Sequence, residues 1–110
     1  MSELDAEDDK LVVLARGAMA RAGTDQGAAV RDSDGRTYAA GQVDLSSLRL
    51  TALQAAVAAA LSSGAEGFEA AVLLGGDAGD AGVTAVREVS AGARVVVTGR
   101  DGAVLAVHNG

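Results

Sequence analysis

The segment GGDAGDAG, residues 75–82, contains polar side chains that could bind a ligand. It follows an apolar run and precedes a helical pattern, a position where free backbone N–H groups often bind phosphate. It matches neither a GxGxxG pattern nor a P-loop, and Asp77 and Asp80 would repel an anion. Together with Asp44 they could bind a hard cation, but helix capping by Asp80 is the favoured role.

His108 is the only histidine, and the chain contains no cysteine. A disulfide or a thiolate metal site therefore cannot form, and one histidine cannot complete a tetrahedral zinc site. We expect His108 to be a solvated residue at the end of a strand, because no Ser-His-Asp or Cys-His arrangement can be assembled around it. The sequence predicts no metal and no cofactor.

Length and charge narrow the function classes further. We expect one domain over residues 1–110, with a flexible N-terminus at residues 1–6. The formal charge of -6 argues against nucleic acid or anionic lipid as a partner. No signal peptide or membrane-spanning run is evident, so we expect a cytoplasmic protein. Abundant alanine, and arginine in excess over lysine, suggest a GC-rich bacterial genome.

Apolar periodicity predicts an alternation of helices and strands that would position these side chains. Helices are predicted at about residues 7–22, 51–61 and 83–91. Strands are predicted as a hairpin within residues 27–41, a buried run at 68–76, and a second hairpin over residues 94–98 and 103–108. In the first helix the apolar face is Leu11, Leu14, Ala15, Ala18 and Ala22, and Asp8 and Asp9 suit the positive end of the helix dipole.

The segment GAAVRDSDGRTYAAGQVD, residues 27–44, resembles the small cytidine deaminases. The positions that fit directly are Gly27, Asp34, Gly35, Arg36, Tyr38 and Val43. Element order and apolar pattern extend the resemblance from about residue 8 to residue 107. The resemblance implies a three-layer α/β/α sandwich around a five-stranded mixed sheet whose last two strands are antiparallel.

That family uses a Cys-Ala-Glu or His-Ala-Glu triplet, in which the first residue binds zinc and the Glu carries protons to and from zinc-bound water. The matching triplet here is Thr51-Ala52-Leu53, and the family's Cys-x-x-Cys falls at about Gly79 and Gly82. On this comparison we expect a degenerate member of the family that lacks zinc and is not an enzyme.

Thr51 is followed three residues later by Gln54, which is the spacing of a capping box at a helix start. This structural role is favoured for Thr51. The alternative is that its hydroxyl contacts a ligand.

The family's Asn-Val-Glu segment, whose polar side chains hold the ribose hydroxyls, is matched by Gln42-Val43-Asp44. Gln42 and Asp44 could therefore hydrogen-bond a sugar. Both residue types are also common at strand ends for turn formation, and that reading is favoured.

The helix 51–61 is apolar on nearly every side, which is typical of a helix that is covered all round. We therefore expect a homo-oligomer, a dimer or tetramer, formed through this helix, as the resemblance also implies. Two functions follow. The first is a structural or regulatory interaction domain without catalysis, and the second is a nucleoside or nucleotide sensor that uses Gln42 and Asp44.

Overall fold

The computed structural model describes residues 4–110. The elements in chain order are α1 (Ala6–Ala22), β1 (Gly27–Asp32), β2 (Thr37–Gly41), β3 (Val43–Asp44), β4 (Arg49–Leu50), α2 (Ala52–Ser62), β5 (Phe68–Leu74), α3 (Ala81–Val89), β6 (Arg94–Thr98) and β7 (Val104–His108). The predicted flexible N-terminus, residues 1–6, lies partly outside the described residues. Within it, Asp5 caps α1 and Ala6 begins that helix.

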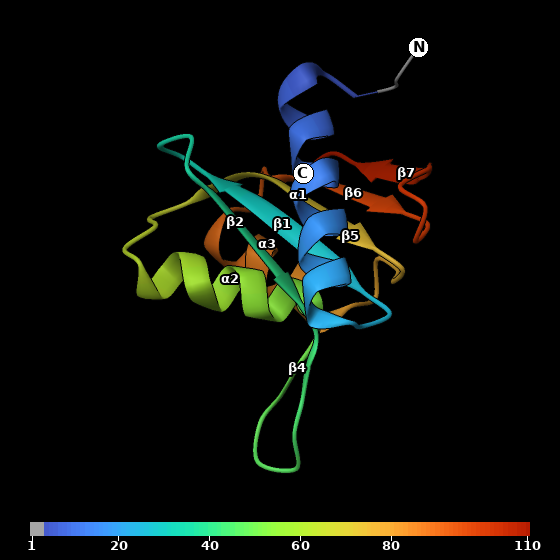
Figure 1. The fold of residues 1–110 in the computed structure, drawn as a ribbon. Coiled ribbons are helices and arrows are strands. Elements are labelled where there is room, and N and C mark those ends of the chain that lie inside the picture. Colours follow the sequence, from blue (N-terminus) through green and yellow to red (C-terminus); the bar gives the residue numbers. More distant parts are fainter. Residues whose placement is uncertain (1–3) are drawn as a thin grey trace.

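Five strands form one mixed sheet in the order β2-β1-β5-β6-β7. Only β5 and β6 are parallel, and the last two strands, β6 and β7, pair antiparallel as predicted. Helix α1 lies on one face of the sheet, and α2 and α3 lie on the other (Figure 1). The predicted α/β fold with a three-layer arrangement is confirmed.

Strand β1 is buried along its whole length because helices cover both faces of the sheet. Its side chains still alternate. Ala28 and Val30 belong to the core beneath α2 and α3, whereas Ala29 belongs to the core beneath α1. Gly27 permits a close approach of α1, since a Cβ atom there would lie 2.3 Å from the carbonyl oxygen of Ala15.

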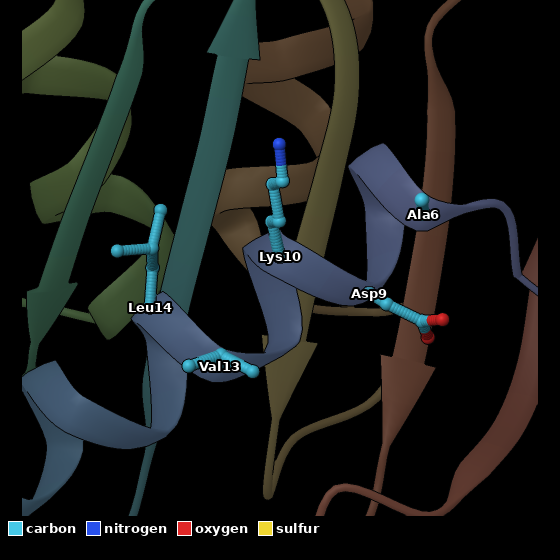
Figure 2. Close-up of a pocket in the computed structure, with 5 residues that line it drawn as sticks. All are labelled: Ala6, Asp9, Lys10, Val13 and Leu14. Carbon is cyan, nitrogen blue, oxygen red and sulfur yellow. The ribbon is translucent and has the colours of Figure 1, made fainter.

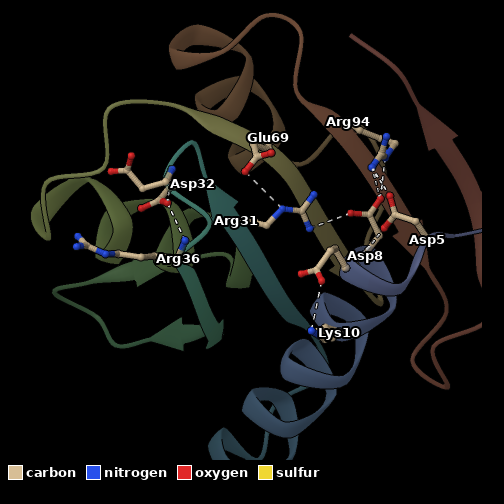
Figure 3. Close-up of polar contacts among 10 residues, drawn as sticks. Asp5, Asp8, Lys10, Arg31, Asp32, Arg36, Glu69 and Arg94 are labelled. Carbon is tan, nitrogen blue, oxygen red and sulfur yellow. Dashed lines mark hydrogen bonds and ion pairs between the residues drawn. The ribbon is translucent and has the colours of Figure 1, made fainter.

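An ion-pair network centred on the buried Asp8 joins α1 to the sheet (Figure 3). Asp8 is 1% exposed, and its carboxylate accepts hydrogen bonds from Nη1 of Arg31 at 3.1 Å and from Nε of Arg94 at 2.7 Å. Glu69 approaches Nε of Arg31 at 3.7 Å from β5. The sequence predicted only a helix-dipole role for Asp8, so this network is a new finding.

The short strands β3 and β4 form a two-stranded arm, residues 43–50, that extends away from the body of the protein (Figure 1). Val43 pairs with Leu50, and Asp44 pairs with Arg49. Sequence analysis missed the arm because two residues per strand are too few to show an alternating pattern. The arm leads directly into α2 and so determines what stands beside the start of that helix.

Two helix predictions need correction. Leu14 and Ala22 were placed on the apolar face of the first helix but are exposed, Leu14 at 39%, whereas Leu11, Ala15 and Ala18 are buried as predicted. The third helix begins at Ala81 rather than at residue 83, because Asp80 accepts a hydrogen bond from the backbone N–H of Gly82 and starts the helix earlier. It ends at Val89 rather than at residue 91, because Ser90 has an extended backbone. No helix within residues 4–110 is long and apolar enough to cross a membrane.

Candidate functional site

A pocket of about 270 Å³ lies between the arm and the start of α2. Its walls are formed by Gln42, Val43, Asp44, Arg49, Leu50, Thr51 and Gln54. The structure therefore brings together three side chains that the sequence singled out separately: Gln42, Asp44 and Thr51.

The start of α2 is closed by the predicted capping box. The hydroxyl of Thr51 accepts the backbone N–H of Gln54 at 3.1 Å, and Oε1 of Gln54 accepts the backbone N–H of Thr51 at 3.0 Å. These two bonds satisfy amides that would otherwise lack a partner at the helix start. The structural role predicted for Thr51 is confirmed.

Thr51 also connects α2 to α3. Its hydroxyl donates a hydrogen bond to Oδ1 of Asp80 at 2.8 Å, and the same oxygen accepts the backbone N–H of Gly82 at 2.7 Å. We call this chain of bonds, from Gln54 through Thr51 and Asp80 to Gly82, the cross-cap. It ties the N-terminal ends of the two helices to each other.

Leu53 and Gly82 fill the space beneath the cross-cap. Leu53 is fully buried, and Gly82 lies against it. A Cβ atom on Gly82 would lie 2.6 Å from Cβ of Leu53 and 2.8 Å from the backbone nitrogen of Gln54. No side chain larger than hydrogen fits at residue 82 without a shift of the surrounding atoms.

The residues present here do not fit the tetrahedral zinc site that the resemblance implies. Such a site takes thiolate, imidazole or carboxylate ligands. Gly79 and Gly82 have no side-chain ligands, and Oδ1 of Asp80 already accepts two hydrogen bonds. Within residues 4–110, no group of three or more His, Cys, Asp or Glu residues is placed to hold a metal ion.

The polar groups of the pocket come from the arm and from the segment that enters it. Nε of Arg49 lies 3.4 Å from Oδ1 of Asp44, and both side chains are largely exposed. Gln42 is held by its backbone N–H, which donates to the hydroxyl of Thr24 at 3.3 Å. A carboxylate, an amide and a guanidinium therefore line one pocket and can hydrogen-bond hydroxyl or anionic groups of a ligand.

Sequence analysis missed Arg49 and Leu50 as pocket residues. The only signal for Arg49 was a lone basic side chain, and its position opposite Asp44 depends on a pairing of two residues per strand. His108 is exposed at the end of β7, as expected. Asp80 caps α3, as favoured, and Asp77 accepts the backbone N–H of Gly79 within its loop.

A titratable cluster lies in the turn at the opposite end of the β1–β2 hairpin (Figure 3). Burial raises the pKa of the Asp32 carboxyl, but hydrogen bonds that include those from the Arg36 backbone N–H and the Tyr38 hydroxyl lower it below its ordinary value. Burial and the Asp32 carboxylate raise the pKa of Tyr38. These groups shape the turn and do not face the pocket beside α2.

A second hollow, of about 430 Å³, lies on the outer side of α1 and is lined by Ala6, Asp9, Lys10, Val13 and Leu14 (Figure 2). All five residues come from one helix. A surface of this kind does not enclose a small molecule, and ligand sites are normally concave. The pocket beside α2 is the better candidate because several elements converge on it.

The comparisons with known proteins agree with this fold. A family model described as cytidine deaminase-like matches residues 4–102, and the chain belongs to this family. No curated protein sequence matches the chain. A cytidine deaminase from Burkholderia pseudomallei has a similar structure, with a TM-score of 0.78 and 22% identity over 99% of this chain and 93% of that one.

Two mycobacterial structures are also similar. A cytidine deaminase from Mycobacterium leprae has a TM-score of 0.72 and 18% identity, covering 96% of this chain and 94% of that one. A mutant cytidine deaminase from Mycobacterium tuberculosis has a TM-score of 0.66 and 24% identity, covering 84% of this chain and 85% of that one. At these identities the likeness shows a shared fold.

The prediction that the protein is not an enzyme was wrong. The family model is described as cytidine deaminase-like and the similar structures are cytidine deaminases, so the family points to an enzyme. Thr51, Leu53 and the absence of cysteine bear on one zinc mechanism only. The pocket holds a carboxylate, amides and a hydroxyl.

Proposed function

We propose that the pocket between the arm and α2 binds a nucleoside or nucleotide. The observation that carries the proposal is the convergence of Gln42 and Asp44, the two matches to the family's sugar-binding residues, on one pocket. A carboxylate accepts hydrogen bonds from two neighbouring hydroxyl groups, and an amide both donates and accepts. Ribose offers such a pair of hydroxyls.

The size and charge of the pocket support the same ligand class. About 270 Å³ is close to the lower end of small-molecule pockets, roughly 300 Å³, so it suits the sugar with part of the ligand left outside. Arg49 adds a guanidinium that can bind a phosphate through paired N–H groups. Nucleosides and their 5′-monophosphates are therefore both candidates.

Isothermal titration calorimetry with cytidine, uridine, adenosine and their 5′-monophosphates tests the proposal. We expect saturable binding to the native protein, and a loss of about tenfold or more in affinity on Asp44→Ala because a charged hydrogen bond is removed. Arg49→Ala should weaken only the phosphorylated ligands. Asp34→Ala, in the exposed turn at the far end of the β1–β2 hairpin, is the matched control and should bind normally. No heat from any ligand at millimolar concentration would overturn the proposal.

We also propose that the chain acts as a homo-oligomeric interaction domain, with a structural or regulatory role, through α2 and the neighbouring arm. Leu45 and Leu48, in the turn of the arm, are 58% and 49% exposed. Leu53 and Val57 of α2 pack into the core, so the outer side of α2 is formed mainly by alanines. A second copy that covers this small-residue surface would also cover the arm.

Light scattering coupled to size exclusion tests the oligomer. We expect a dimer or tetramer at micromolar concentration, and dissociation on Leu45→Glu combined with Leu48→Glu. Leu105→Glu places a single glutamate at a leucine of β7 that is 69% exposed, and it should leave the assembly intact. A monodisperse native monomer would overturn the proposal.

A cytoplasmic location stays a prediction.

A further inference from the structure

The outer face of α1 is apolar and exposed (Figure 2). Val13 is 68% exposed and Leu14 is 39% exposed beside the hollow of about 430 Å³. Single exposed apolar side chains are ordinary on a protein surface. Here they belong to a regular stripe whose members are alternately four and three residues apart: Ala6, Lys10, Val13, Gly17 and Ala20. This spacing is typical of a helix that packs along another helix, and we call the stripe together with Leu14 the outer α1 face.

The outer α1 face leaves room for a second helix to come close. At Gly17 the nearest atom to an added Cβ is Nη1 of Arg21 at 3.3 Å, which is the end of a flexible side chain. Glycine inside a helix costs stability relative to alanine, and a close contact with a neighbouring helix would offset that cost. The stem of Lys10 can cover apolar surface while its ammonium group stays in water.

Charge is divided between the two ends of α1. Glu7 and Asp9 lie in its first turn, whereas residues 11–22 contain no acidic residue and carry Arg16 and Arg21. Both arginines are exposed, and within residues 4–110 neither forms an ion pair or a side-chain hydrogen bond. A helix with one acidic end and one basic end is complementary to a second, identical helix that runs in the opposite direction.

We propose that the outer α1 face binds the same face of a second copy of this chain, with the two helices antiparallel and related by a two-fold axis. A two-fold contact requires a surface that is complementary to itself, and the division of charge along α1 meets this requirement. The antiparallel pairing of a seven-residue repeat sets Asp9 beside Arg16 of the second copy. The same register sets Leu14 against Leu14 of the second copy. A parallel arrangement would instead bring the two acidic ends together.

This contact is separate from the one proposed for α2. Helices α1 and α2 lie on opposite faces of the sheet (Figure 1), so one protomer can use both surfaces at once. The inference rests neither on the nucleoside pocket nor on the contact through α2. Exposed ion pairs contribute little to affinity, so Val13 and Leu14 should supply most of the binding. The charges should determine the direction in which the helices pair.

Light scattering coupled to size exclusion tests the inference in the arm variant, which combines Leu45→Glu with Leu48→Glu. This variant removes the contact proposed for α2, and we expect it to dissociate only as far as a dimer at micromolar concentration. Adding Val13→Glu should convert that dimer to a monomer. Leu105→Glu is the matched control, because Leu105 is 69% exposed and Val13 is 68% exposed. It should leave the dimer intact.

A charge swap in the arm variant tests the antiparallel direction. Arg16→Asp sets an acidic group beside Asp9 of the second copy and should weaken the dimer by about tenfold or more. Adding Asp9→Arg sets opposite charges beside each other again and should restore the dimer. Failure of the second change to restore the dimer would overturn the antiparallel pairing.

Gly17→Gln separates association from folding. In the arm variant it should give a monomer, because the longer side chain fills the space that the second helix needs. In the monomer that contains Val13→Glu it should raise the melting temperature, since glutamine is a better helix former than glycine.

The remaining outcomes distinguish this inference from the contact through α2. A monomeric arm variant, or a dimer that persists with both Val13→Glu and Gly17→Gln, would overturn the inference and leave the contact through α2 standing. A native assembly that Val13→Glu alone converts to a monomer, and that the arm variant leaves unchanged, would support the inference and defeat the contact through α2.

Discussion

The hydroxyl of Thr51 lies 2.8 Å from Oδ1 of Asp80 and donates a hydrogen bond to it, which joins the N-terminal ends of α2 and α3. The resemblance to cytidine deaminases places zinc ligands at these two helix ends. In this chain, protein groups of Thr51, Gln54, Asp80 and Gly82 hydrogen-bond to one another there. The cross-cap therefore connects the two helices without a metal ligand.

The cross-cap predicts an energetic coupling between Thr51 and Asp80. Thr51→Val should lower the free energy of unfolding by about 0.5–2 kcal/mol, because the helix cap and the bond to Asp80 are both lost. Urea denaturation of this variant, of Asp80→Ala and of the double variant should show non-additive effects of about 0.5 kcal/mol or more. Thr51→Ser keeps the hydroxyl and is the control. Additive effects would show that the bond between the two residues contributes nothing.

Gly82 should be intolerant of a side chain. The atoms nearest to an added Cβ are Cβ and Cγ of Leu53 and the backbone nitrogen of Gln54, none of which is the end of a flexible chain. We expect Gly82→Ala to destabilise the protein by about 1–3 kcal/mol through overpacking. Gly92→Ala is the matched control, because no atom lies within 4 Å of a Cβ there. Equal denaturation midpoints for the two variants would refute the prediction.

Asp8 should contribute far more to stability than an exposed acidic residue of the same helix. Removing one partner of a buried ion pair leaves an uncompensated charge and costs about 3–5 kcal/mol. We expect Asp8→Ala to approach this loss, because the carboxylate is 1% exposed and binds Arg31 and Arg94. The exposed pair of Glu7 with Lys10 offers the comparison, and Glu7→Ala should cost less than about 1 kcal/mol. A similar loss for both would contradict the network.

Tyr38 is the only tyrosine, so its titration can be followed directly by ultraviolet absorbance. Burial and the hydrogen bond to Asp32 raise the pKa of its hydroxyl above the ordinary value of 10.0. Asp32→Asn removes the negative charge, and the pKa of Tyr38 should fall toward that value without reaching it, since burial persists. An unchanged titration curve would show that the two groups do not interact.

Because of the same hydrogen bonds, the free energy of unfolding should depend on pH in the acidic range. The pKa of Asp32 is lower in the folded protein than its ordinary value of 3.8. The stabilisation that the Asp32 carboxylate gives the folded protein is therefore complete above its ordinary pKa of 3.8. This stabilisation is lost as the pH falls toward the folded-state pKa. Urea denaturation below pH 4 should show the native protein losing stability more steeply than Asp32→Asn. Parallel pH profiles would contradict this.

Local pattern was sufficient to predict most of the fold. The hairpin around the Asp-Gly turn, the capping box of Thr51 with Gln54 and the antiparallel last pair of strands each depend on residues close together in the sequence. The features that were missed depend on distant residues. The pairing of Asp8 with Arg31 and Arg94, and the bond from Thr51 to Asp80, join residues that only the folded chain brings together.

The candidate site could be predicted only in part for the same reason. Gln42 and Asp44 were found through a motif resemblance, and the arm that places Arg49 opposite Asp44 is too short to leave a periodic signal.

Chemical-shift mapping of the ¹⁵N-labelled protein with cytidine tests the central claim most directly, because it reports both whether a nucleoside binds and where. We predict saturable shifts of the backbone amides of the pocket residues Gln42, Asp44, Thr51 and Gln54, with none at Asp34 in the distant turn. Shifts confined to the outer side of α1, or no shifts at millimolar cytidine, would contradict a nucleoside site between the arm and α2.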